Sequence, residues 1–328
     1  MSNRSIRALW YVGAGRAELR PERVAAPAPA EVRVRALFGA ISRGTERLVF
    51  EGRVPPSQYL RMRGPHMAGE FPFPAKYGYA TVGRVEQGPD ELQDQIVFAL
   101  HPHQSVFTVA ADAVLPVPKQ VPPRRAVLAA NMETALNGVW DGAPGPADLI
   151  AVVGGGVLGL LVARLCVRMP GTQVTVVDTV ASRAEVAQAL GAGFAAPAAA
   201  PEGCDLVFHA SGTAAGLATA LRLAGEEATI VELSWYGTGD VAAPLGEEFH
   251  SRRLRLVSSQ VGQVAPSHRP RWSRARRLAA ALDLLADPAL DGLLAAAVPF
   301  EDLPERLAEI LGSQTDARCP LIHYPGLD

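Results

Sequence analysis

The chain has 328 residues, of which 48% are hydrophobic and 20% charged, and its formal net charge is −2. This composition is typical of a globular protein long enough for two domains, and the charge argues against a general nucleic-acid or membrane-surface binder. Three isolated cysteines, with no C-x-x-C pattern, exclude a disulfide framework and a cysteine-rich zinc site. No apolar run has the length of a signal peptide or a membrane span, so we expect a cytoplasmic protein.

The first part of the chain, up to residue 118, has a β-rich pattern. Short alternating runs separated by Gly and Pro residues predict strands at 8–12, 31–37, 81–85 and 95–100. No helical periodicity of any length is found before residue 124. A helix is then expected at 124–140, between Pro122-Pro123 and Gly142.

From residue 149 the pattern alternates between strand and helix, which predicts a parallel, doubly wound sheet. The expected strands are 149–153, 173–177, 204–208, 228–234 and 254–260. The expected helices are 156–168, 181–190 and 213–224. A basic helix at 273–286, a helix at 301–312 and a strand at 320–324 should follow.

The most informative stretch is a glycine-rich turn after the strand at 149–153. It consists of Gly154, Gly155, Gly156, Val157, Leu158 and Gly159, which fit the pattern G-x-G-x-x-G. Such glycines allow a tight turn, close approach of the backbone to a pyrophosphate, and close packing of helix on strand. The next strand ends on Asp178, where a carboxylate accepts hydrogen bonds from adenosine ribose hydroxyls and repels a 2′-phosphate. The stretch predicts a dinucleotide site for NAD rather than NADP; the alternative is a glycine-rich corner without a ligand.

Further candidate cofactor contacts follow the later strands. Ligands of doubly wound sheets bind beyond the carboxyl ends of the strands, and Ser211 and Ser234 each follow such a strand. Trp235 has two possible roles. It is either an aromatic wall that faces the nicotinamide or a flat substrate, or a residue that anchors the loop. Arg183, five residues past Asp178, either lies over the adenine or begins a helix.

The order of a β-rich part, an inserted nucleotide-binding part and a returning C-terminal segment resembles the medium-chain dehydrogenase/reductase superfamily, which includes the zinc alcohol dehydrogenases. The resemblance covers nearly the whole chain and is carried by residues 41–46, 77–85, the glycine turn and 187–192. It implies an α/β fold with a GroES-like catalytic domain (1–121 and 263–328) and a Rossmann domain (122–262). It also implies a homodimer paired through the strand at 254–259.

Within this superfamily, residues 41–48 and 52–56 look like a zinc-less branch that includes bacteriochlorophyllide a dehydrogenase. The branch implies a small-molecule substrate with a secondary alcohol or ketone, with a large ring as one candidate. The resemblance aligns the three zinc-ligand positions with Arg43, Tyr79 and Ala130. None of these is a usual zinc ligand, so we expect no catalytic metal. A substitute site made of His66, His101 and His103 is the alternative.

Without a metal, protein groups must move the hydroxyl proton and stabilise the carbonyl charge. Thr45 matches the hydroxyl that begins the proton relay in zinc relatives, or it caps a turn. Tyr79 either binds the substrate oxygen, with a cation such as Arg43 lowering the pKa of its phenol, or fills the space of the lost metal. Arg43 is alternatively a site for a substrate carboxylate. Glu46 and Glu133 are either bases or partners of buried arginines.

Five arginines between His268 and Arg277 form either a solvated helix face or a site for an anionic group on the substrate. The sequence hypothesis is therefore a zinc-independent oxidoreductase that transfers a hydride between NAD and a secondary alcohol or ketone. One alternative is a zinc-free enoyl or quinone reductase. Another is a dinucleotide-binding protein without turnover.

Overall fold

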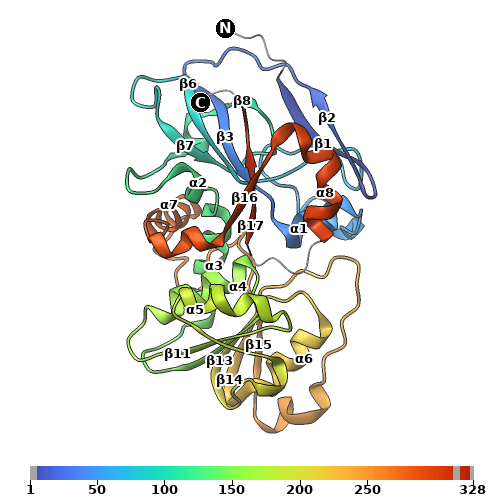
Figure 1. Ribbon diagram of the computed structural model, residues 1–328, viewed down its shortest axis with the longest axis vertical. Coiled ribbons are helices and arrows are strands. Elements are labelled where there is room, and N and C mark those ends of the chain that lie inside the picture. The colour runs from blue at the N-terminus through green and yellow to red at the C-terminus, as the bar shows by residue number, and fades with distance from the viewer. Residues whose placement is uncertain (1–5, 313–317, 326–328) are drawn as a thin grey trace.

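A computed structural model describes residues 6–312 and 318–325, and Figure 1 shows two sheet-containing parts stacked along the long axis of the molecule. One part holds a six-stranded parallel sheet of order β12-β11-β10-β13-β14-β15. Its strands are β10 (Leu149–Val153), β11 (Gln173–Val177), β12 (Gly193–Ala195), β13 (Cys204–His209), β14 (Ala224–Glu232) and β15 (Arg255–Ser258). The chain leaves β10 toward β11 on one side and returns to β13 on the other, so a ligand crevice is expected beyond β10 and β13.

Helices cover both faces of this sheet because the strands are apolar on both sides. Ile150 and Val152 of β10 belong to the core cluster shared with α3 (Ala129–Gly142) and α4 (Val157–Val167). The alternate residues Ala151 and Val153 belong to the cluster that includes α6 (Ala214–Leu223). A shorter helix, α5 (Ala184–Ala189), follows β11.

The other part is built from two antiparallel-rich sheets. The larger sheet has the order β16-β17-β3-β6-β7-β9, with β8 paired to β3. Its strands are β3 (Glu31–Ala40), β6 (Thr81–Gln87), β7 (Ile96–Ala99), β8 (Val106–Ala110), β9 (Val114–Pro116), β16 (Leu294–Pro299) and β17 (Cys319–His323). The smaller sheet has the order β2-β1-β5-β4, from β1 (Arg7–Gly13), β2 (Arg16–Pro21), β4 (Ala68–Gly69) and β5 (Ala75–Lys76). The C-terminal strands thus complete a sheet begun by the N-terminal ones, as Figure 1 shows in red and blue.

The expected fold class, a Rossmann-type parallel sheet plus a β-rich GroES-like part, is confirmed. One expectation about elements was wrong, because a helix does occur before residue 124, namely α1 (Arg43–Phe50). Strand β16 is among the elements that the sequence did not predict. Gly44 and Thr45 are weak helix formers, so α1 has little local signal and depends on tertiary contacts. Its last residues, 48–50, are buried in the β-rich core.

Three further helices are α2 (Pro123–Ala126), α7 (Arg274–Leu284) and α8 (Leu303–Gly312), and α8 packs on α1 and β2 in the β-rich part. Helix α7 packs on α3 through Arg277, which is 1% exposed. The Arg277 guanidinium donates to Glu133 Oε1 at 3.0 Å and to the carbonyl oxygen of Gln263 at 3.0 Å. Burial raises the pKa of Glu133 despite the opposing charge of Arg277, so this ion pair is expensive to desolvate. Among the described residues, no helix is both long and apolar enough to cross a bilayer.

Replacing Arg277 with Met should lower the free energy of unfolding by about 3–5 kcal/mol, because Glu133 then remains buried without a cation. Denaturant unfolding measures this change. The double variant Arg277→Met with Glu133→Leu should recover much of the loss. Arg276→Met, at the exposed neighbouring position, is the matched control and should cost about 1 kcal/mol or less. Equal effects of the two single substitutions would contradict the assignment.

Candidate active site

The turn between β10 and α4 is shaped by close backbone contacts. Gly154 has a φ of 111°, and a Cβ there would lie 2.7 Å from the backbone nitrogen of Ser211. A Cβ on Gly159 would lie 1.9 Å from the carbonyl oxygen of Gly154. Only glycine therefore lets α4 approach the strand at this point, as the sequence pattern predicts.

Open space lies on the other side of the same turn. A Cβ on Gly156 would meet no atom within 4 Å. Gly156 is the N-cap of α4, and Val157 and Leu158 follow it in the first turn. The first N–H groups of a helix have no acceptor within the helix and carry partial positive charge, which suits an anion. The turn therefore fits the pyrophosphate of a dinucleotide.

Asp178 lies directly beside this turn and is 8% exposed. Its Oδ2 accepts hydrogen bonds from the backbone nitrogen of Gly155 at 2.6 Å and from Arg183 Nη1 at 2.7 Å. Its Oδ1 accepts from the backbone nitrogen of Val180 at 2.9 Å. Arg183 is also the N-cap residue of α5, so it pairs with Asp178 and begins a helix. These contacts hold the carboxylate at the edge of the glycine turn.

The carboxyl ends of β13 and β14 carry a connected polar group. His209 is fully buried, with Nδ1 2.7 Å from Glu232 Oε2 and Nε2 2.7 Å from Ser211 Oγ. Glu232 Oε1 accepts from the backbone nitrogen of Ser234 at 2.7 Å. The Ser234 hydroxyl in turn accepts from the backbone nitrogen of Gly212 at 3.0 Å. The two predicted serines thus belong to one network next to the glycine turn.

The loop after β14 also reaches the β-rich part. The backbone nitrogen of Thr238 donates to the carbonyl oxygen of Arg53 at 3.1 Å, and a Cβ on Gly237 would lie 2.9 Å from Leu48 of α1. Trp235 packs against the core cluster of the β-rich part, which contains Tyr11 and Tyr77. Trp235 therefore anchors this loop between the two parts, which is the loop-anchor role considered for it from the sequence.

Glu46 of α1 is the centre of the β-rich half of the site and is completely buried. Its Oε2 lies 2.7 Å from the Tyr11 hydroxyl and 2.9 Å from His103 Nε2, and its Oε1 accepts from the backbone nitrogen of Ser42 at 2.8 Å. Since a carboxylate only accepts, both Tyr11 and His103 donate to it. Burial and then the Glu46 charge raise the pKa of Tyr11 well above its usual value. Glu46 is thus a partner of Tyr11 and His103 rather than of an arginine.

Tyr79 lies beside this centre and packs against the core clusters of both parts. Burial, followed by the negative charge of Glu46, raises the pKa of Tyr79 to about 12, although the nearby Ser42 and Thr45 side chains oppose the shift. The structure therefore brings Thr45 and Tyr79 together, as the sequence hypothesis requires. Because its pKa is raised, the Tyr79 phenol stays protonated at neutral pH and is a hydrogen-bond donor.

Arg43 does not lower the pKa of Tyr79, and this part of the sequence hypothesis is wrong. Its guanidinium donates to the carbonyl oxygens of Ile310 at 3.0 Å and Arg318 at 2.9 Å, near the end of α8. Arg47 donates to the carbonyl oxygen of Leu311 at 2.7 Å. A helix C-terminus attracts cations, so these arginines hold α1 against α8.

Two other predicted groups are used for packing. Glu133 pairs with the buried Arg277, which is the second of the two roles considered for it. In the arginine cluster, Arg276 stacks over Trp272 with its guanidinium carbon 4.0 Å from the ring centroid. Arg269 and Arg271 donate to backbone carbonyl oxygens of neighbouring residues. The cluster thus includes structural contacts as well as exposed charge.

The zinc-ligand positions of the superfamily do not fit zinc in this chain. Arg43 extends toward α8, Ala130 has no ligand atom, and a phenol with a raised pKa does not readily become an anionic ligand. Within the described ranges, no group of three His, Cys, Asp or Glu residues could hold a metal ion. His66 and His101 stack with ring centroids 5.4 Å apart, and burial lowers the pKa of His101 to about 3.

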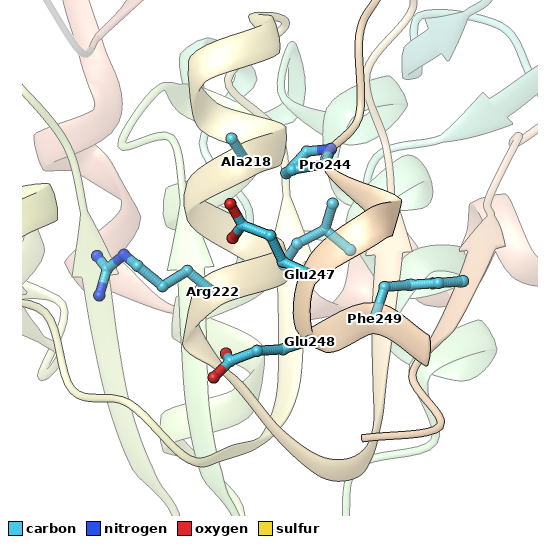
Figure 2. A pocket seen from close by; sticks show the side chains of 7 residues that line it. Ala218, Arg222, Pro244, Glu247, Glu248 and Phe249 are labelled. Atoms are coloured by element: carbon cyan, nitrogen blue, oxygen red, sulfur yellow. The ribbon is translucent and has the colours of Figure 1, made fainter. Parts of the chain in front are cut away.

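Sequence reasoning missed Tyr11, His103, His209 and Glu232 as members of polar networks. The two histidines had a signal, since each follows a predicted strand, but their partners are distant in sequence. Figure 2 shows a hollow elsewhere, beside α6. Its lining residues are Ala218, Leu221, Arg222, Pro244, Glu247, Glu248 and Phe249. None of them belongs to the predicted site.

Known proteins resemble this chain weakly in sequence and closely in fold. No family model matches the sequence. D-guloside 3-dehydrogenase of Escherichia coli (strain K12) is 26% identical over 306 residues, which cover 84% of this chain and 87% of that protein. The protein of the same name from Shigella flexneri gives the same values.

Solved structures match over nearly the full length. L-idonate 5-dehydrogenase of Escherichia coli has a TM-score of 0.78 at 14% identity and covers 97% of this chain and 98% of its own. A dehydrogenase of Sinorhizobium meliloti that is named as zinc-binding and is bound to NADP has a TM-score of 0.76 at 18% identity, with 97% and 99% covered. An Escherichia coli alcohol dehydrogenase complexed with NADH has a TM-score of 0.76 at 15% identity, with 97% and 99% covered. This chain therefore has the fold of these alcohol and polyol dehydrogenases, which confirms the predicted resemblance at the level of the fold; the zinc-less branch stays a prediction.

Adding one methyl group at Gly156 tests the pyrophosphate site. Gly156→Ala should leave unfolding of the free protein nearly unchanged, because its Cβ meets no atom within 4 Å. It should weaken NADH binding tenfold or more, about 1.4 kcal/mol, by occupying space needed for the phosphates. Fluorescence titration measures the affinity. Gly292→Ala, also at an open position, is the control and should bind as the parent does. Unchanged binding by Gly156→Ala would rule out this placement.

Proposed function

We propose that this protein is a zinc-independent, NAD-linked dehydrogenase that interconverts a secondary alcohol and a ketone on a polyol or sugar-like substrate. The observation that carries the proposal is the position of Tyr79 beside the buried Glu46, with the Ser42 and Thr45 side chains close enough to act on the pKa of its phenol. This group stands where the superfamily resemblance puts the metal. It offers neutral hydrogen-bond donors to a substrate oxygen.

The chemistry divides between the cofactor and the side chains. NAD, when bound, supplies the hydride acceptor for alcohol oxidation, or as NADH the hydride donor for ketone reduction. Tyr79 donates a hydrogen bond to the substrate oxygen, which stabilises negative charge on it. In ketone reduction Tyr79 gives its proton to the alkoxide oxygen, and the Thr45 and Ser42 hydroxyls near the phenol provide a route by which a proton returns to it from solvent; in alcohol oxidation the hydroxyl proton leaves by the reverse route. Burial and then the negative charge of Glu46 keep Tyr79 protonated, and Glu46 also fixes α1 through the backbone of Ser42.

The names of the similar proteins support the substrate class. They are a guloside dehydrogenase and an idonate dehydrogenase, both named for sugar-derived substrates. We therefore favour a sugar-like secondary alcohol over a large ring. The positive charge of the arginines between His268 and Arg277 keeps an anionic substrate as a candidate, although several of these side chains already contact the protein.

We infer NAD as the cofactor from Asp178. Its carboxylate is held beside the glycine turn by Gly155 and Arg183, at the position expected for the ribose hydroxyls. A 2′-phosphate there would meet this negative charge. The fold itself accepts both cofactors, since one similar structure is bound to NADP and another to NADH.

We also propose that the protein forms a homodimer through β15. This strand is hydrogen-bonded to β14 and lies at the end of the six-stranded order. Leu256 on it is 40% exposed, which is high for a large apolar side chain. Pairing of two such edges would cover the open backbone groups and this side chain.

Tyr79→Phe should reduce kcat by roughly 10²–10⁴-fold with little change in stability, because it removes the donor and keeps the ring. Thr45→Val should reduce kcat less, because the Ser42 hydroxyl remains near the phenol. In ketone reduction the parent rate should stay independent of Tyr79 ionisation up to roughly pH 10, since the pKa is raised to about 12. Stopped-flow reduction with sugar-derived ketones and NADH measures these rates.

Unchanged turnover in both variants would refute this catalytic assignment. Metal analysis of the purified protein is the companion measurement. One equivalent of bound zinc, together with activity lost on chelation, would refute zinc independence. Turnover with enones or quinones alone would favour the reductase alternative, and cofactor binding without turnover on any substrate would favour a non-catalytic protein.

Asp178→Ser should relax the choice of cofactor. Removing the carboxylate takes away the repulsion and leaves Arg183 available to a 2′-phosphate, so NADPH affinity should rise about tenfold to a hundredfold relative to NADH. Paired titrations with the two reduced cofactors measure the ratio. Asp205→Ser, at an exposed acid on β13 in the same sheet, is the control. A parent protein that already prefers NADPH would contradict the NAD assignment.

A further inference from the structure

Three aromatic rings lie together where the end of α3 meets the segment before α7, on the α7 side of the molecule in Figure 1. The Trp140 and His268 rings are stacked, with centroids 4.1 Å apart and an interplanar angle of 4°. Trp272 lies against Trp140 with centroids 4.8 Å apart, and each of the three rings is half-buried. We call these rings, together with four neighbouring arginines, the α7 surface; the arginines are Arg269, Arg271, Arg274 and Arg276.

The α7 surface carries positive charge that no carboxylate neutralises. Its four arginines are exposed, and none of them makes an ion pair with a described residue. The contrast is clear at a similar stack on the β1–β2 hairpin, where the Arg20 guanidinium lies 5.0 Å from the Trp10 ring centroid. There Arg20 pairs with Glu18 at 2.7 Å, and Trp10 donates to Glu22 at 3.1 Å. The arginines of the α7 surface therefore repel one another and attract an anion.

Backbone carbonyl groups hold two of these arginine side chains in place. Arg269 Nη2 donates to the carbonyl oxygen of Val264 at 3.2 Å, and Arg276 Nη1 donates to that of Arg271 at 2.8 Å. A guanidinium has five donor hydrogens, so one or two such bonds leave others for a ligand. Burial and then the charge of Arg271 lower the pKa of His268, so this ring is neutral at neutral pH.

The α7 surface begins at the edge of the parallel sheet where the strands end. Asp141 follows Trp140 in α3, and its Oδ2 accepts from the Ser259 hydroxyl at 2.6 Å and from Asn137 Nδ2 at 3.1 Å. Ser259 directly follows β15, so these bonds tie the surface to the carboxyl end of that strand. Doubly wound sheets bind their ligands beyond this edge. The same bonds engage the carboxylate of Asp141 with the protein.

The α7 surface is separate from the two parts of the proposed site. Asp178 follows β11, and four strand spacings lie between β11 and β15, which is about 19 Å. Trp140 is ten residues along α3 from Ala130, which is about 15 Å at the rise of a helix. The adenosine end of a cofactor beside Asp178 therefore does not reach this surface. A single sugar ring that reacts beside Tyr79 does not reach it either.

We propose that the α7 surface binds the nucleoside diphosphate group of a second nucleotide, distinct from the cofactor. Tryptophan rings stack on nucleobases, and the planar fork of an arginine matches two phosphate oxygens. A basic surface confined to one flank of a chain with net charge −2 favours a single nucleotide over a nucleic-acid strand. The nucleotide is either free or linked to a sugar that extends along α3 toward Tyr79. The inference goes beyond the proposed function, and only the sugar-linked case rests on it.

Calorimetric titration with UDP and with ADP tests the proposal, with NADH held at about ten times its dissociation constant to fill the cofactor site. One equivalent of each nucleotide should bind, and the affinity should fall as salt is added. Arg276→Gln and Trp272→Leu should each weaken binding by at least about tenfold while NADH affinity keeps its parent value. Arg20→Gln and Trp10→Leu change the similar stack on the hairpin and should bind both nucleotides as the parent does.

Failure of UDP and ADP to bind, or unchanged affinity in Trp272→Leu, would overturn the inference. Pyrophosphate that binds as tightly as UDP would also overturn it, because the rings would then contribute nothing. A single-stranded oligonucleotide that binds far more tightly than UDP would assign the surface to nucleic acid instead. Thermal unfolding of each variant separates loss of fold from loss of binding. If NADH itself does not bind, the proposed function fails alone, because UDP is then titrated without it.

Turnover separates the two sources of the nucleotide. If the nucleotide carries the substrate, UDP-glucose should be oxidised with NAD, and Arg276→Gln should raise its KM about tenfold with kcat unchanged. If the nucleotide is free, UDP should change the rate at which sugar-derived ketones are reduced with NADH, and Arg276→Gln should abolish this effect. Either result supports a nucleotide at the α7 surface, and a response that is the same in Arg276→Gln and in the parent contradicts it.

Discussion

The buried carboxylate of Glu46 is the constraint on which the β-rich half of the site depends. An isolated carboxylate in a protein interior costs several kcal/mol, and this one is completely buried. Three donors compensate it: the Tyr11 hydroxyl from β1, His103 from the β7–β8 connection, and the backbone nitrogen of Ser42 at the start of α1. One side chain therefore fixes a strand, a loop and a helix together. The role resembles that of a structural metal ion, but hydrogen bonds perform it.

The second half of the site depends on the first through the loop after β14. Trp235 packs into the same core cluster that holds Tyr11, and the following residues bond to Arg53 beyond α1. At its other end the loop begins at Glu232, which holds His209. One continuous segment therefore connects α1 with the ends of β13 and β14. This arrangement explains why a loop at a cofactor site carries two large aromatic residues.

The sequence predicted the parallel sheet well because its signals are local. Strands 149–153 and 173–177 occur at the expected residues, since each is a short apolar run bounded by turns. Helix α1 was missed because Gly44 and Thr45 give it little intrinsic propensity and its arginines are bonded to α8, far along the chain. The Glu46–His103 contact joins residues 57 positions apart. No periodicity in the sequence encodes such a pair, so the candidate residues were predictable but their partners were not.

The same physical arrangement occurs on both sides of the candidate cleft. Glu46 with His103, and Glu232 with His209, are each a buried carboxylate–imidazole pair beside a cluster of hydroxyls. The hydrogen of a hydroxyl group can rotate. The direction in which it donates is therefore set by the group that donates to its oxygen and the group that accepts its proton. A buried acid–imidazole pair provides such a fixed reference, and low polarity around it strengthens every hydrogen bond it makes. Under the proposed zinc-independent function, orientation of hydroxyls by these pairs would take the place of polarisation by a metal. The two pairs differ in one respect that matters for function: the first is sealed within the β-rich core, whereas the second is in contact, through Ser211, with the turn that fits the dinucleotide.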